Sequence, residues 1–411
     1  MRYGLLGEKL GHSFSKEIHE KLGKYSYELI EVPPHGLDAF LRAKDFAGIN
    51  VTIPYKQAVI PYLDALSDRA KAIGAVNTVV NRDGKLCGDN TDFGGLTALI
   101  KRMGLNLNGK TVLICGAGGT SKTAWAVAEH LGAAEVYRLS RSGREGALTY
   151  EEAYAAHADA EILINTTPSG MYPDTDGVPL DPERLPKLQG VVDVIYNPLT
   201  TRLAQAARAR GIPAENGLYM LVAQAVLAAE AFTGERFGAE TVDRIYHEIL
   251  SDKRNIVLTG MPGSGKSTIG RLLADRLGRA LTDTDAEIVT AVGTPITEIF
   301  RAHGEPYFRD MESQVIRNLS NTGGKIIATG GGAVLRRENV DTLKQNGVVV
   351  FLDRAPEDLL PTDDRPLSDN AEKLRALYET RYPVYLAAAD VTVPVRGTPE
   401  DTTNDLLEML Q

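Results

Sequence analysis

The sequence predicts an α/β protein with parallel sheets, divided into more than one domain. Its 411 residues exceed what one ordinary hydrophobic core organises. Strand and helix signals alternate along the chain, a pattern typical of parallel sheets covered by helices. Two glycine-rich stretches, "GAGGTSK" at 116–122 and "GMPGSGKST" at 260–268, each lie between a predicted strand and a predicted helix. Both therefore have the position of a nucleotide-binding loop.

The composition is that of an ordinary globular protein, and it limits the partners. Hydrophobic residues make up 43% of the chain and charged residues 24%, and the net charge is −9. Because no basic surplus is available to neutralise phosphates, we expect neither nucleic acid nor an anionic membrane as a partner. Small anionic molecules can still bind through local Arg and Lys side chains. The sequence leaves the oligomeric state open.

We expect no metal-binding cysteine cluster, no disulfide framework and no membrane anchor. The two cysteines, Cys87 and Cys115, form no C-x-x-C pair, and the seven histidines are scattered. The most apolar predicted helix, 218–232, contains polar residues and would reach only roughly 22 Å, short of the ~30 Å hydrocarbon layer. Residues 1–13 lack the apolar core of a signal peptide, so we expect a cytoplasmic protein.

The first 104 residues are expected to form one lobe. Its predicted elements are a strand, a hairpin and a helix, at 49–54, 76–88 and 92–103. Pro54 ends the strand, and Asp83-Gly84 supplies the positive φ angles that a tight hairpin turn requires. Gly104 closes the helix, since glycine readily adopts the left-handed conformation found after a helix end.

A second lobe is expected over 105–216, followed by helices that return to the first lobe. Its predicted strands are 111–115, 135–140, 161–165 and 191–196, with a helix over 123–132. Helices predicted over 217–232 and 240–250 close the first lobe, so that lobe comprises 1–104 and 217–250. The polar residues 251–253 are predicted to be a linker.

The third domain is expected over 254–411. A new strand at 256–260 begins a second series of strands and helices. The final helix has three start signals, with Thr398 as N-cap, Pro399 in the first turn and Asp401 at the third position.

The stretch "LICGAGGTSKTAW", at 113–125, resembles two kinds of phosphate loop. A Gly at position 121 would complete the ATP loop, whereas Gly or Ala there would complete the dinucleotide loop G-x-G-x-x-G/A. An ATP loop needs that Gly before its Lys, and no nearby acidic pair is available to hold magnesium. Gly116 and Gly118 stand where a pyrophosphate approaches the backbone, and a small Ser121 is tolerable against the strand. The pattern therefore favours a dinucleotide.

The end of the next predicted strand indicates which dinucleotide is bound. An NAD enzyme usually has Asp or Glu there to accept hydrogen bonds from the ribose hydroxyls. Here Ser140-Arg141-Ser142 offers donors and a cation, which suit a 2′-phosphate, so we expect NADP(H). The simpler alternative is that the glycines form a plain tight turn and that Arg141 is a solvated side chain.

Over residues 1 to about 250 the sequence resembles shikimate dehydrogenase. The motifs that carry the resemblance occur in the family's order: "GHSFS", "NVTIPYK", "AVNTVV", "DNTDFGG", "GAGG", "NTTPSGM" and "GLYMLVAQA". Ketone reduction needs a hydride on one face and a proton delivered to the nascent alkoxide. Lys56 follows a strand end and Asp92 begins a helix, and such a pair can supply and orient that proton. The resemblance implies that these two residues are catalytic.

The resemblance also implies the binding residues of this enzyme. Ser13 and Ser15 would bind the substrate carboxylate. The ring hydroxyls and carboxylate would also be bound by Thr52, Asn77, Tyr196 and Gln224. The expected NADP-binding residues are Gly116, Ala117, Gly118, Gly119, Thr120, Ser140, Arg141, Ser142, Thr166 and Gly217. Taken singly, Lys56 could be a surface cation, and Asp92 and Ser15 could be helix N-caps.

The second glycine stretch matches the ATP loop at every position. It follows a predicted strand and begins a predicted helix, as that loop requires. Lys266 would reach the β- and γ-phosphates, and Ser267 would ligate Mg²⁺. The expected ATP-binding residues of the loop are Gly263, Ser264, Gly265, Lys266, Ser267 and Thr268. The alternative, an accidental glycine loop, is disfavoured by this context.

From about residue 254 to 411 the sequence resembles shikimate kinase, on "TDTD", "GEPYFRDMES", "TGGGAVL", "DDRPL" and "RYPVYLAAAD". The resemblance implies that Asp285 binds the acceptor and takes its proton, and that Asp283 lies near Mg²⁺. Arg309 and Arg381 would grip the acceptor carboxylate, with Arg309 oriented by Glu312 one turn later.

The same resemblance implies a glycine segment and a lid around the acceptor. Gly330 to Gly332, with Gly331 at the centre, would bring backbone close to the acceptor ring. Arg365 would neutralise charge on the transferred phosphate. The lid "LLPTDDRPL" is shorter than the family pattern, so weaker closure is expected. The simpler alternatives are a helix-surface pair for Arg309 and Glu312, and a plain turn for the glycines.

Together the two resemblances imply reduction of 3-dehydroshikimate with NADPH, followed by phosphorylation of shikimate with ATP and Mg²⁺. The partners would then be small molecules. One rival keeps the chemistry but changes the substrate, to quinate for the dehydrogenase or another small polyol for the kinase. A second rival is a nucleotide-sensing protein in which one site has decayed.

Overall fold

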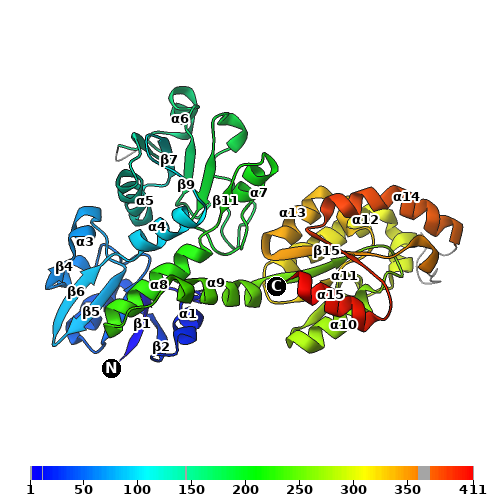
Figure 1. Ribbon diagram of the computed structural model, residues 1–411, viewed down its shortest axis with the longest axis horizontal. Helices are drawn as coiled ribbons and strands as arrows, with labels where there is room; N and C mark the ends of the chain where they lie inside the picture. The colour runs from blue at the N-terminus through cyan, green and yellow to red at the C-terminus, as the bar shows by residue number, and fades with distance from the viewer. Residues whose placement is uncertain (1, 12, 144–145, 360–370, 411) are drawn as a thin grey trace. The chain divides into compact units, whose positions relative to one another are not determined.

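The computed structural model describes residues 2–11, 13–143, 146–359 and 371–410 (Figure 1). The chain divides into two compact units, Met1–Leu250 and Ser251–Gln411. Both are α/β, as predicted, and together they contain three sheets. No helix in the described ranges is long and apolar enough to cross a membrane.

The first sheet of unit 1 is mixed, with strand order β2-β1-β3-β5-β6-β4. Its strands are β1 Tyr3–Gly7, β2 Tyr27–Glu31, β3 Gly48–Val51, β4 Ala65–Leu66, β5 Thr78–Arg82 and β6 Lys85–Asp89. The predicted hairpin is confirmed: β5 and β6 pair antiparallel around Asp83 and Gly84, whose φ angles are 53° and 83°. The strand predicted over 49–54 ends earlier, because a turn begins at Thr52, whose carbonyl accepts from Tyr55 N.

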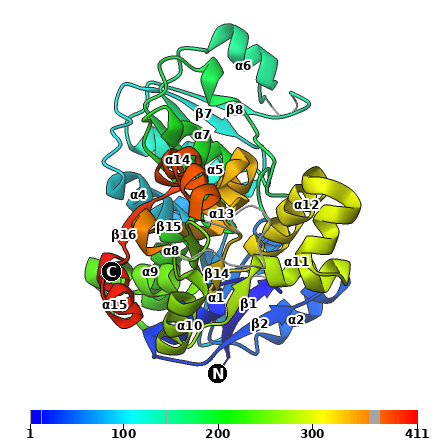
Figure 2. The ribbon, with the colours of Figure 1, turned by 90° about the vertical axis from the view of Figure 1, so that its right-hand side faces the viewer.

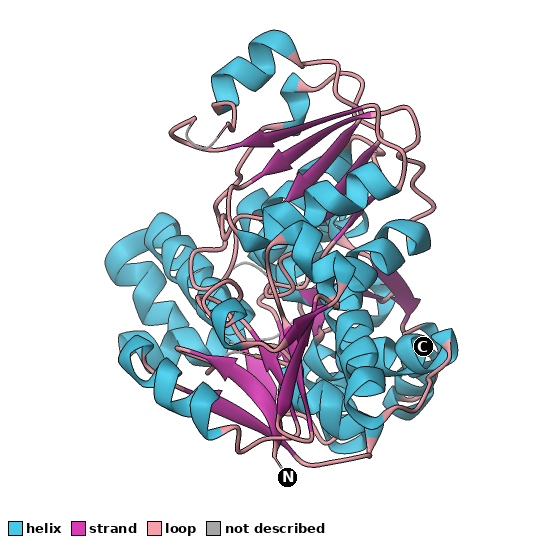
Figure 3. Cartoon of the chain, turned by 90° about the vertical axis from the view of Figure 1, so that its left-hand side faces the viewer, coloured by secondary structure: helices cyan, strands magenta, loops and turns pink. Residues whose placement is uncertain are grey.

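The lobe built on this sheet contains helices from both ends of unit 1 (Figure 3). They are α1 Ser15–Leu22, α2 Leu37–Ala43, α3 Asp68–Ile73, α4 Asp92–Arg102, α8 Leu218–Thr233 and α9 Ala239–Lys253. Leu5, Tyr27 and Val80 pack against Phe232 of α8 on one face. A Cβ at Gly48 would lie 2.3 Å from the Phe232 ring, so glycine permits this contact.

The second sheet of unit 1 is parallel throughout, in the order β11-β10-β9-β7-β8. Its elements are β7 Thr111–Cys115, α5 Gly119–His130, β8 Glu135–Leu139, α6 Tyr150–Ala156, β9 Ile162–Asn165, β10 Gly190–Asp193, α7 Arg202–Ala209 and β11 Ala214–Glu215. The central strands β7, β9 and β10 are almost entirely buried, as expected for apolar strands covered on both faces, whereas β8 at one edge is mostly half-buried.

The predicted linker over 251–253 is wrong. Helix α9 continues through Lys253, and β12 begins at Asn255, so only Arg254 separates the two elements. Ser251, Asp252 and Lys253 are polar but include neither Gly nor Pro, so nothing in them breaks a helix. A short polar stretch without helical periodicity predicted a loop here, but it forms the exposed end of a helix.

Unit 2 is built on a second parallel sheet, in the order β13-β14-β12-β15-β16 (Figure 2). Its strands are β12 Asn255–Thr259, β13 Leu281–Asp283, β14 Ile326–Ala328, β15 Gly347–Asp353 and β16 Val391–Pro394. Its helices are α10 Lys266–Leu277, α11 Thr284–Val292, α12 Ile296–Ser320, α13 Arg337–Asn346, α14 Ala371–Ala388 and α15 Pro399–Met409. The predicted start of the last helix is confirmed, since Thr398 and Asp401 form a capping box.

Short 3-10 helices complete the described elements of both units. They are η1 Pro34–Gly36, η2 Ile60–Tyr62, η3 Pro182–Arg184, η4 Ala333–Leu335 and η5 Pro356–Asp358.

Candidate active sites

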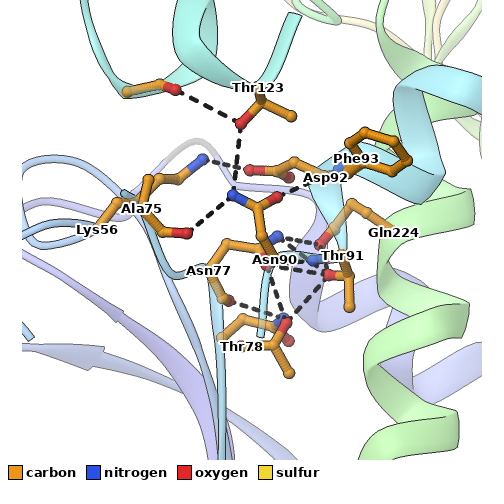
Figure 4. Close-up of polar contacts among 12 residues, drawn as sticks. Lys56, Ala75, Asn77, Thr78, Asn90, Thr91, Asp92, Phe93, Thr123 and Gln224 are labelled. Carbon is orange, nitrogen blue, oxygen red and sulfur yellow. Dashed lines mark hydrogen bonds and ion pairs between the residues drawn. The ribbon is translucent and has the colours of Figure 1, made fainter. Parts of the chain in front are cut away.

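Lys56 and Asp92 form a largely buried ion pair in unit 1 (Figure 4). Lys56 Nζ donates to Asp92 Oδ2 at 2.7 Å, and the side chains are 17% and 10% exposed. Lys56 lies in the turn that follows β3, and Asp92 is the first residue of α4. Lys56 is therefore not a freely solvated surface cation. An ammonium group held this way is suited to deliver a proton.

A buried amide and hydroxyl network lies beside this pair (Figure 4). Asn77 Nδ2 donates to Gln224 Oε1 at 3.3 Å and to Thr91 Oγ1 at 3.0 Å. Thr91 N in turn donates to Asn77 Oδ1 at 2.7 Å, and Thr78 Oγ1 does so at 3.1 Å. Asn77 and Gln224 were singled out in the sequence, whereas Thr91 was missed, although it lies within the motif "DNTDFGG". Such neutral groups suit a polyhydroxylated acid.

Ser13, Ser15 and Tyr196 lie together around Phe14. Ser15 N donates to Ser13 Oγ at 3.2 Å, and the Tyr196 ring packs on Phe14 with centroids 5.1 Å apart. Burial raises the pKa of Tyr196, opposed by its hydrogen bond with Ser13. Helix α1 starts at Ser15 with Phe14 at its N-cap, so Ser15 is not the capping residue. Thr52, just after β3, donates its backbone N–H to Leu6 O.

The glycine loop of unit 1 joins β7 to the start of α5. Gly116 has φ 119°, and a Cβ there would lie 2.5 Å from Thr166 Oγ1, so the loop requires glycine. Gly118 is the N-cap residue of α5, which begins at Gly119. Ser121 is fully buried and donates to Gly118 O at 2.7 Å, so serine fits where the dinucleotide motif has Gly or Ala. A helix start of this form suits a phosphate.

The predicted NADP-reading residues lie at the end of β8. Ser140 Oγ is buried and has no hydrogen-bond partner among the described residues, while Arg141 is exposed. A donor without a partner beside an exposed guanidinium fits a bound phosphate group. Gly217, also predicted to bind NADP, has a packing reason to be glycine, since its Cβ would lie 2.1 Å from Val194 O.

A buried carboxylate that sequence analysis missed connects two loops of this sheet. Asp193, at the end of β10, accepts from Asn165 Nδ2 at 3.0 Å and from Thr201 Oγ1 at 2.7 Å. Burial raises the pKa of Asp193 to about 6, against these hydrogen bonds. Asn165 also accepts from Thr167 N. The network fixes the loops that carry Thr166 and Tyr196; polar residues ending two buried strands were the signal for it.

In the phosphate loop of unit 2, the lysine side chain is hydrogen-bonded to backbone carbonyls of the loop itself. Gly265, with φ 95°, is the N-cap residue of α10, and Lys266 is the first residue of that helix. Lys266 Nζ donates to Gly260 O and Met261 O, both at 2.9 Å. The buried Ser264 Oγ has no hydrogen-bond partner in the described part of the chain. The predicted Gly263, with φ 78°, and Thr268 lie in the same loop and helix start.

The predicted magnesium residues lie next to each other. Ser267 Oγ donates to Asp283 Oδ2 at 3.3 Å. The other oxygen of Asp283 accepts from Asp285 N at 2.9 Å, so this carboxylate also caps α11. A hydroxyl and a carboxylate oxygen this close fit the oxygen preference of Mg²⁺.

The predicted acceptor residues of unit 2 converge on one glycine segment. A Cβ at Gly330 would lie 2.5 Å from Asp285 Oδ1, and one at Gly332 would lie 2.2 Å from Arg309 Nη1. Arg381 Nη1 donates to Gly331 O at 3.1 Å. Larger residues in this segment would therefore displace the side chains proposed to bind the acceptor.

Arg309 and Glu312 form the contact predicted from their spacing, at 2.8 Å, and Glu305 accepts from Arg309 at 3.0 Å. Glu312 is fully buried, so this is not a helix-surface pair. Burial raises the pKa of Glu312, opposed by the Arg309 guanidinium. Arg365, the predicted lid residue, lies outside the described residues.

Comparison with known proteins connects each unit to one family. Residues 5–79 match the shikimate dehydrogenase substrate binding domain, and residues 262–411 match shikimate kinase. The shikimate dehydrogenase (NADP+) of Clostridium perfringens is 36% identical over 264 residues, covering 60% of this chain and 97% of the relative. That of Geobacillus kaustophilus is 42% identical over 255 residues, covering 57% and 92%.

Solved structures give the same result. Shikimate dehydrogenase 1 from Peptoclostridium difficile has a TM-score of 0.57 and 34% identity, covering 61% of this chain and 98% of that one. The Thermus thermophilus enzyme, solved with NADP(H) and shikimate, has a TM-score of 0.54 and 32% identity, covering 60% and 99%. About the first 60% of the chain therefore belongs to the shikimate dehydrogenase family, and residues 262–411 form a shikimate kinase domain, so that one polypeptide unites two activities of the shikimate pathway.

Proposed function

We propose that unit 1 reduces 3-dehydroshikimate to shikimate with NADPH, and that unit 2 phosphorylates the new 3-hydroxyl with MgATP. The observation that carries this proposal is the Lys56–Asp92 pair at 2.7 Å beside the buried Asn77 network. This pair supports the reductive step, and the phosphate loop next to Asp283 and Asp285 supports the phosphorylation.

In the first reaction, NADPH held at the glycine loop would supply a hydride to the ring carbonyl carbon. Lys56 donates a proton to the carbonyl oxygen as negative charge develops there, and Asp92 holds the ammonium group in position. Asn77, Thr91 and Gln224 orient the ring through its hydroxyls, and Ser13 and Ser15 bind the carboxylate. Holding the reacting groups in this geometry contributes much of the acceleration.

The cofactor is proposed to lie along the start of α5. Its pyrophosphate would accept from the backbone N–H groups of Gly118, Gly119 and Thr120, since a helix N-terminus favours an anion. Ser140 and Arg141 would bind the 2′-phosphate. The NADP(H) in the Thermus thermophilus structure and the NADP+ in the names of the curated relatives support this assignment.

In the second reaction, Asp285 takes the proton of the 3-hydroxyl while the hydroxyl oxygen attacks the γ-phosphorus of ATP and ADP leaves. Lys266 leaves the carbonyls of Gly260 and Met261 to bind the phosphates. Ser267 and Asp283 would hold Mg²⁺, which would neutralise phosphate charge. Arg309 and Arg381 bind the acceptor carboxylate, and Arg365 is proposed to reach the transferred phosphate.

A single incubation tests the proposal. Purified full-length protein receives 3-dehydroshikimate, NADPH, ATP and Mg²⁺, while NADPH loss and ADP formation are followed together. We expect both signals, with ADP formation lost when NADPH is omitted and NADPH loss preserved when ATP is omitted. Absence of a phosphorylated ring would refute the consecutive scheme.

The same preparation decides between the rivals. Shikimate and quinate are compared as substrates for NADP+ reduction and for phosphorylation. A higher kcat/KM for quinate would overturn the substrate assignment. A wild-type protein that turns over neither substrate would favour a sensing role.

A further inference from the structure

Asn90 is a fully buried amide two residues before the proposed catalytic carboxylate. Its Oδ1 accepts from Phe93 N at 3.2 Å, in the first turn of α4. The side chain of the N-cap residue, Thr91, accepts no hydrogen bond from the first turn. Asn90 therefore supplies the acceptor for the Phe93 N–H, which has no partner within the helix. Asn90 therefore fixes the helix start that carries Asp92.

The other end of the same side chain reaches two different segments (Figure 4). Asn90 Nδ2 donates to Ala75 O at 3.0 Å, in the segment that leads to Asn77. It also donates to Thr123 Oγ1 at 3.4 Å. Thr123 belongs to α5, and its hydroxyl donates to Gly119 O at 3.5 Å, at the proposed pyrophosphate site. Both amide hydrogens of Asn90 are thus engaged.

Aromatic contacts support the same connection. The Phe93 ring meets His130 of α5 edge-on, with centroids 5.3 Å apart. The Arg69 guanidinium of α3 lies 5.6 Å from the centre of the Phe93 ring. The first turn of α4 therefore contacts both α3 and the cofactor helix through one residue, next to Asp92.

We propose that Asn90 is a positioning residue that couples the catalytic carboxylate to the cofactor-binding helix through Thr123. A cofactor that orders the start of α5 then also favours the arrangement of α4 and Asp92 that binds the substrate. By thermodynamic linkage the substrate favours cofactor binding to the same degree. The inference rests on the proposed function of unit 1.

The test measures coupling rather than activity alone. The dissociation constant of shikimate is determined by calorimetry without and with saturating NADPH, a pair of ligands that cannot react with each other. We expect wild-type protein to bind shikimate about fivefold more tightly, or more, when NADPH is bound. The coupling ratio is the dissociation constant of shikimate without NADPH divided by that with NADPH. In Thr123→Val, which keeps the side-chain shape but removes the acceptor for Asn90, the coupling ratio should fall close to one.

Two further variants control the test. Thr123→Ser keeps the hydroxyl and should retain the wild-type ratio. Thr97→Val removes a hydroxyl of α4 whose one hydrogen bond within the described ranges is to Phe93 O of its own helix, at 2.7 Å, and it should also retain the ratio. General destabilisation by a Thr→Val change would lower the melting temperature without altering the coupling ratio, so it is distinguished from the proposed role.

Asn90→Asp, which keeps the acceptor for Phe93 N but loses both donors, provides a second variant. If it folds, its coupling ratio should also fall toward one; if it does not, Thr123→Val decides. A coupling ratio of one in wild type, or a wild-type coupling ratio in Thr123→Val, overturns the inference while the proposed function stands. A wild-type protein that binds no shikimate at all would instead refute the proposed function.

Discussion

Lys56 Nζ lies 2.7 Å from Asp92 Oδ2, although the two residues are 36 positions apart in the sequence. The contact joins the turn after β3 to the start of α4, and neither side chain is more than one-fifth exposed. The fold thus brings together an acid–base pair from the turn after a central strand of the first sheet and the start of a helix.

Replacing Lys56 by alanine should nearly abolish reduction of 3-dehydroshikimate. A placed acid–base group contributes about 10²–10⁴-fold, so kcat should fall by that factor. The kinase activity of the same preparation serves as the control and should stay within about twofold of wild type, because Lys56 lies in the other compact unit. A variant with near wild-type kcat would remove Lys56 from the proton-delivery step.

The reciprocal variant is Lys266→Ala. Loss of the phosphate-binding ammonium should lower kcat for shikimate phosphorylation by about 10²–10³-fold, on the scale of losing one preorganised charge-stabilising group. The measurement is ADP formation with saturating shikimate, and NADPH oxidation by the same sample is the control. Equal loss of both activities would indicate a folding defect in place of a catalytic one.

Arg141→Ala should discriminate between the two dinucleotides. A hydrogen bond to a charged group is worth about 1.5–3 kcal/mol, so KM for NADPH should rise roughly 10- to 150-fold. NADH lacks the 2′-phosphate, and KM for NADH should therefore change little. Parallel increases for both cofactors would argue against a 2′-phosphate contact at this position.

Gly95→Ala should disturb the packing of α4 on α8. A Cβ at Gly95 would lie 2.6 Å from Met220 O and 3.0 Å from Gln224 Cβ, so the helices must separate. We expect a loss of about 1–3 kcal/mol in unfolding free energy and a higher KM for 3-dehydroshikimate, because Gln224 moves away from Asn77.

Fluorescence can follow the unfolding of this variant, because the chain has one tryptophan, Trp125, which lies in unit 1. Gly11→Ala is the matched control, since a Cβ there meets no atom within 4 Å. Equal urea midpoints for the two variants would contradict the packing argument.

The stability of unit 1 should depend on His19 below neutral pH. Burial lowers the pKa of His19 from 6.5 to about 3, against a hydrogen bond with Asn50. The unfolded state therefore binds a proton from pH 6.5 downward while the folded state does not. The contribution of His19 to the free energy of unfolding is therefore fully present above pH 6.5, and it falls by about 1.4 kcal/mol per pH unit as the pH drops from 6.5 toward 3.

His19→Phe should remove this slope in urea unfolding followed through Trp125. Asp193, whose folded pKa is raised to about 6, acts in the opposite sense below pH 6, but it is present in both proteins and cancels in the comparison. His35→Phe, at an exposed position, should keep the wild-type slope. Parallel pH profiles for wild type and His19→Phe would show that His19 does not carry the effect.

Local signals in the sequence predicted much of the fold and part of both sites. Asp83-Gly84 predicted the hairpin because a tight turn needs two successive residues with positive φ angles, which few residue types adopt. Thr398 and Asp401 predicted a helix start because their side chains satisfy backbone N–H groups there. Lys266 and Ser267 could be predicted as phosphate-site residues because a phosphate loop is continuous in sequence.

Contacts between distant segments were not predictable in this way. Asn90 bonds to Ala75 and to Thr123, and Asp193 bonds to Asn165, and no local pattern specifies such partners. The continuation of α9 to Lys253 was missed because the helix signal of its last turn comes from the absence of breakers, not from periodicity.

Helix α8 packs on the N-terminal sheet, with Phe232 against Gly48 and beside Leu5 and Val80. On the ribosome, strand β1 therefore emerges long before the helix that shields it, and the sheet of β7 to β11 is synthesised in between. One face of the N-terminal sheet therefore stays uncovered until α8, Leu218–Thr233, has been synthesised. Nascent chains that stall before Phe232 would present that apolar face to chaperones.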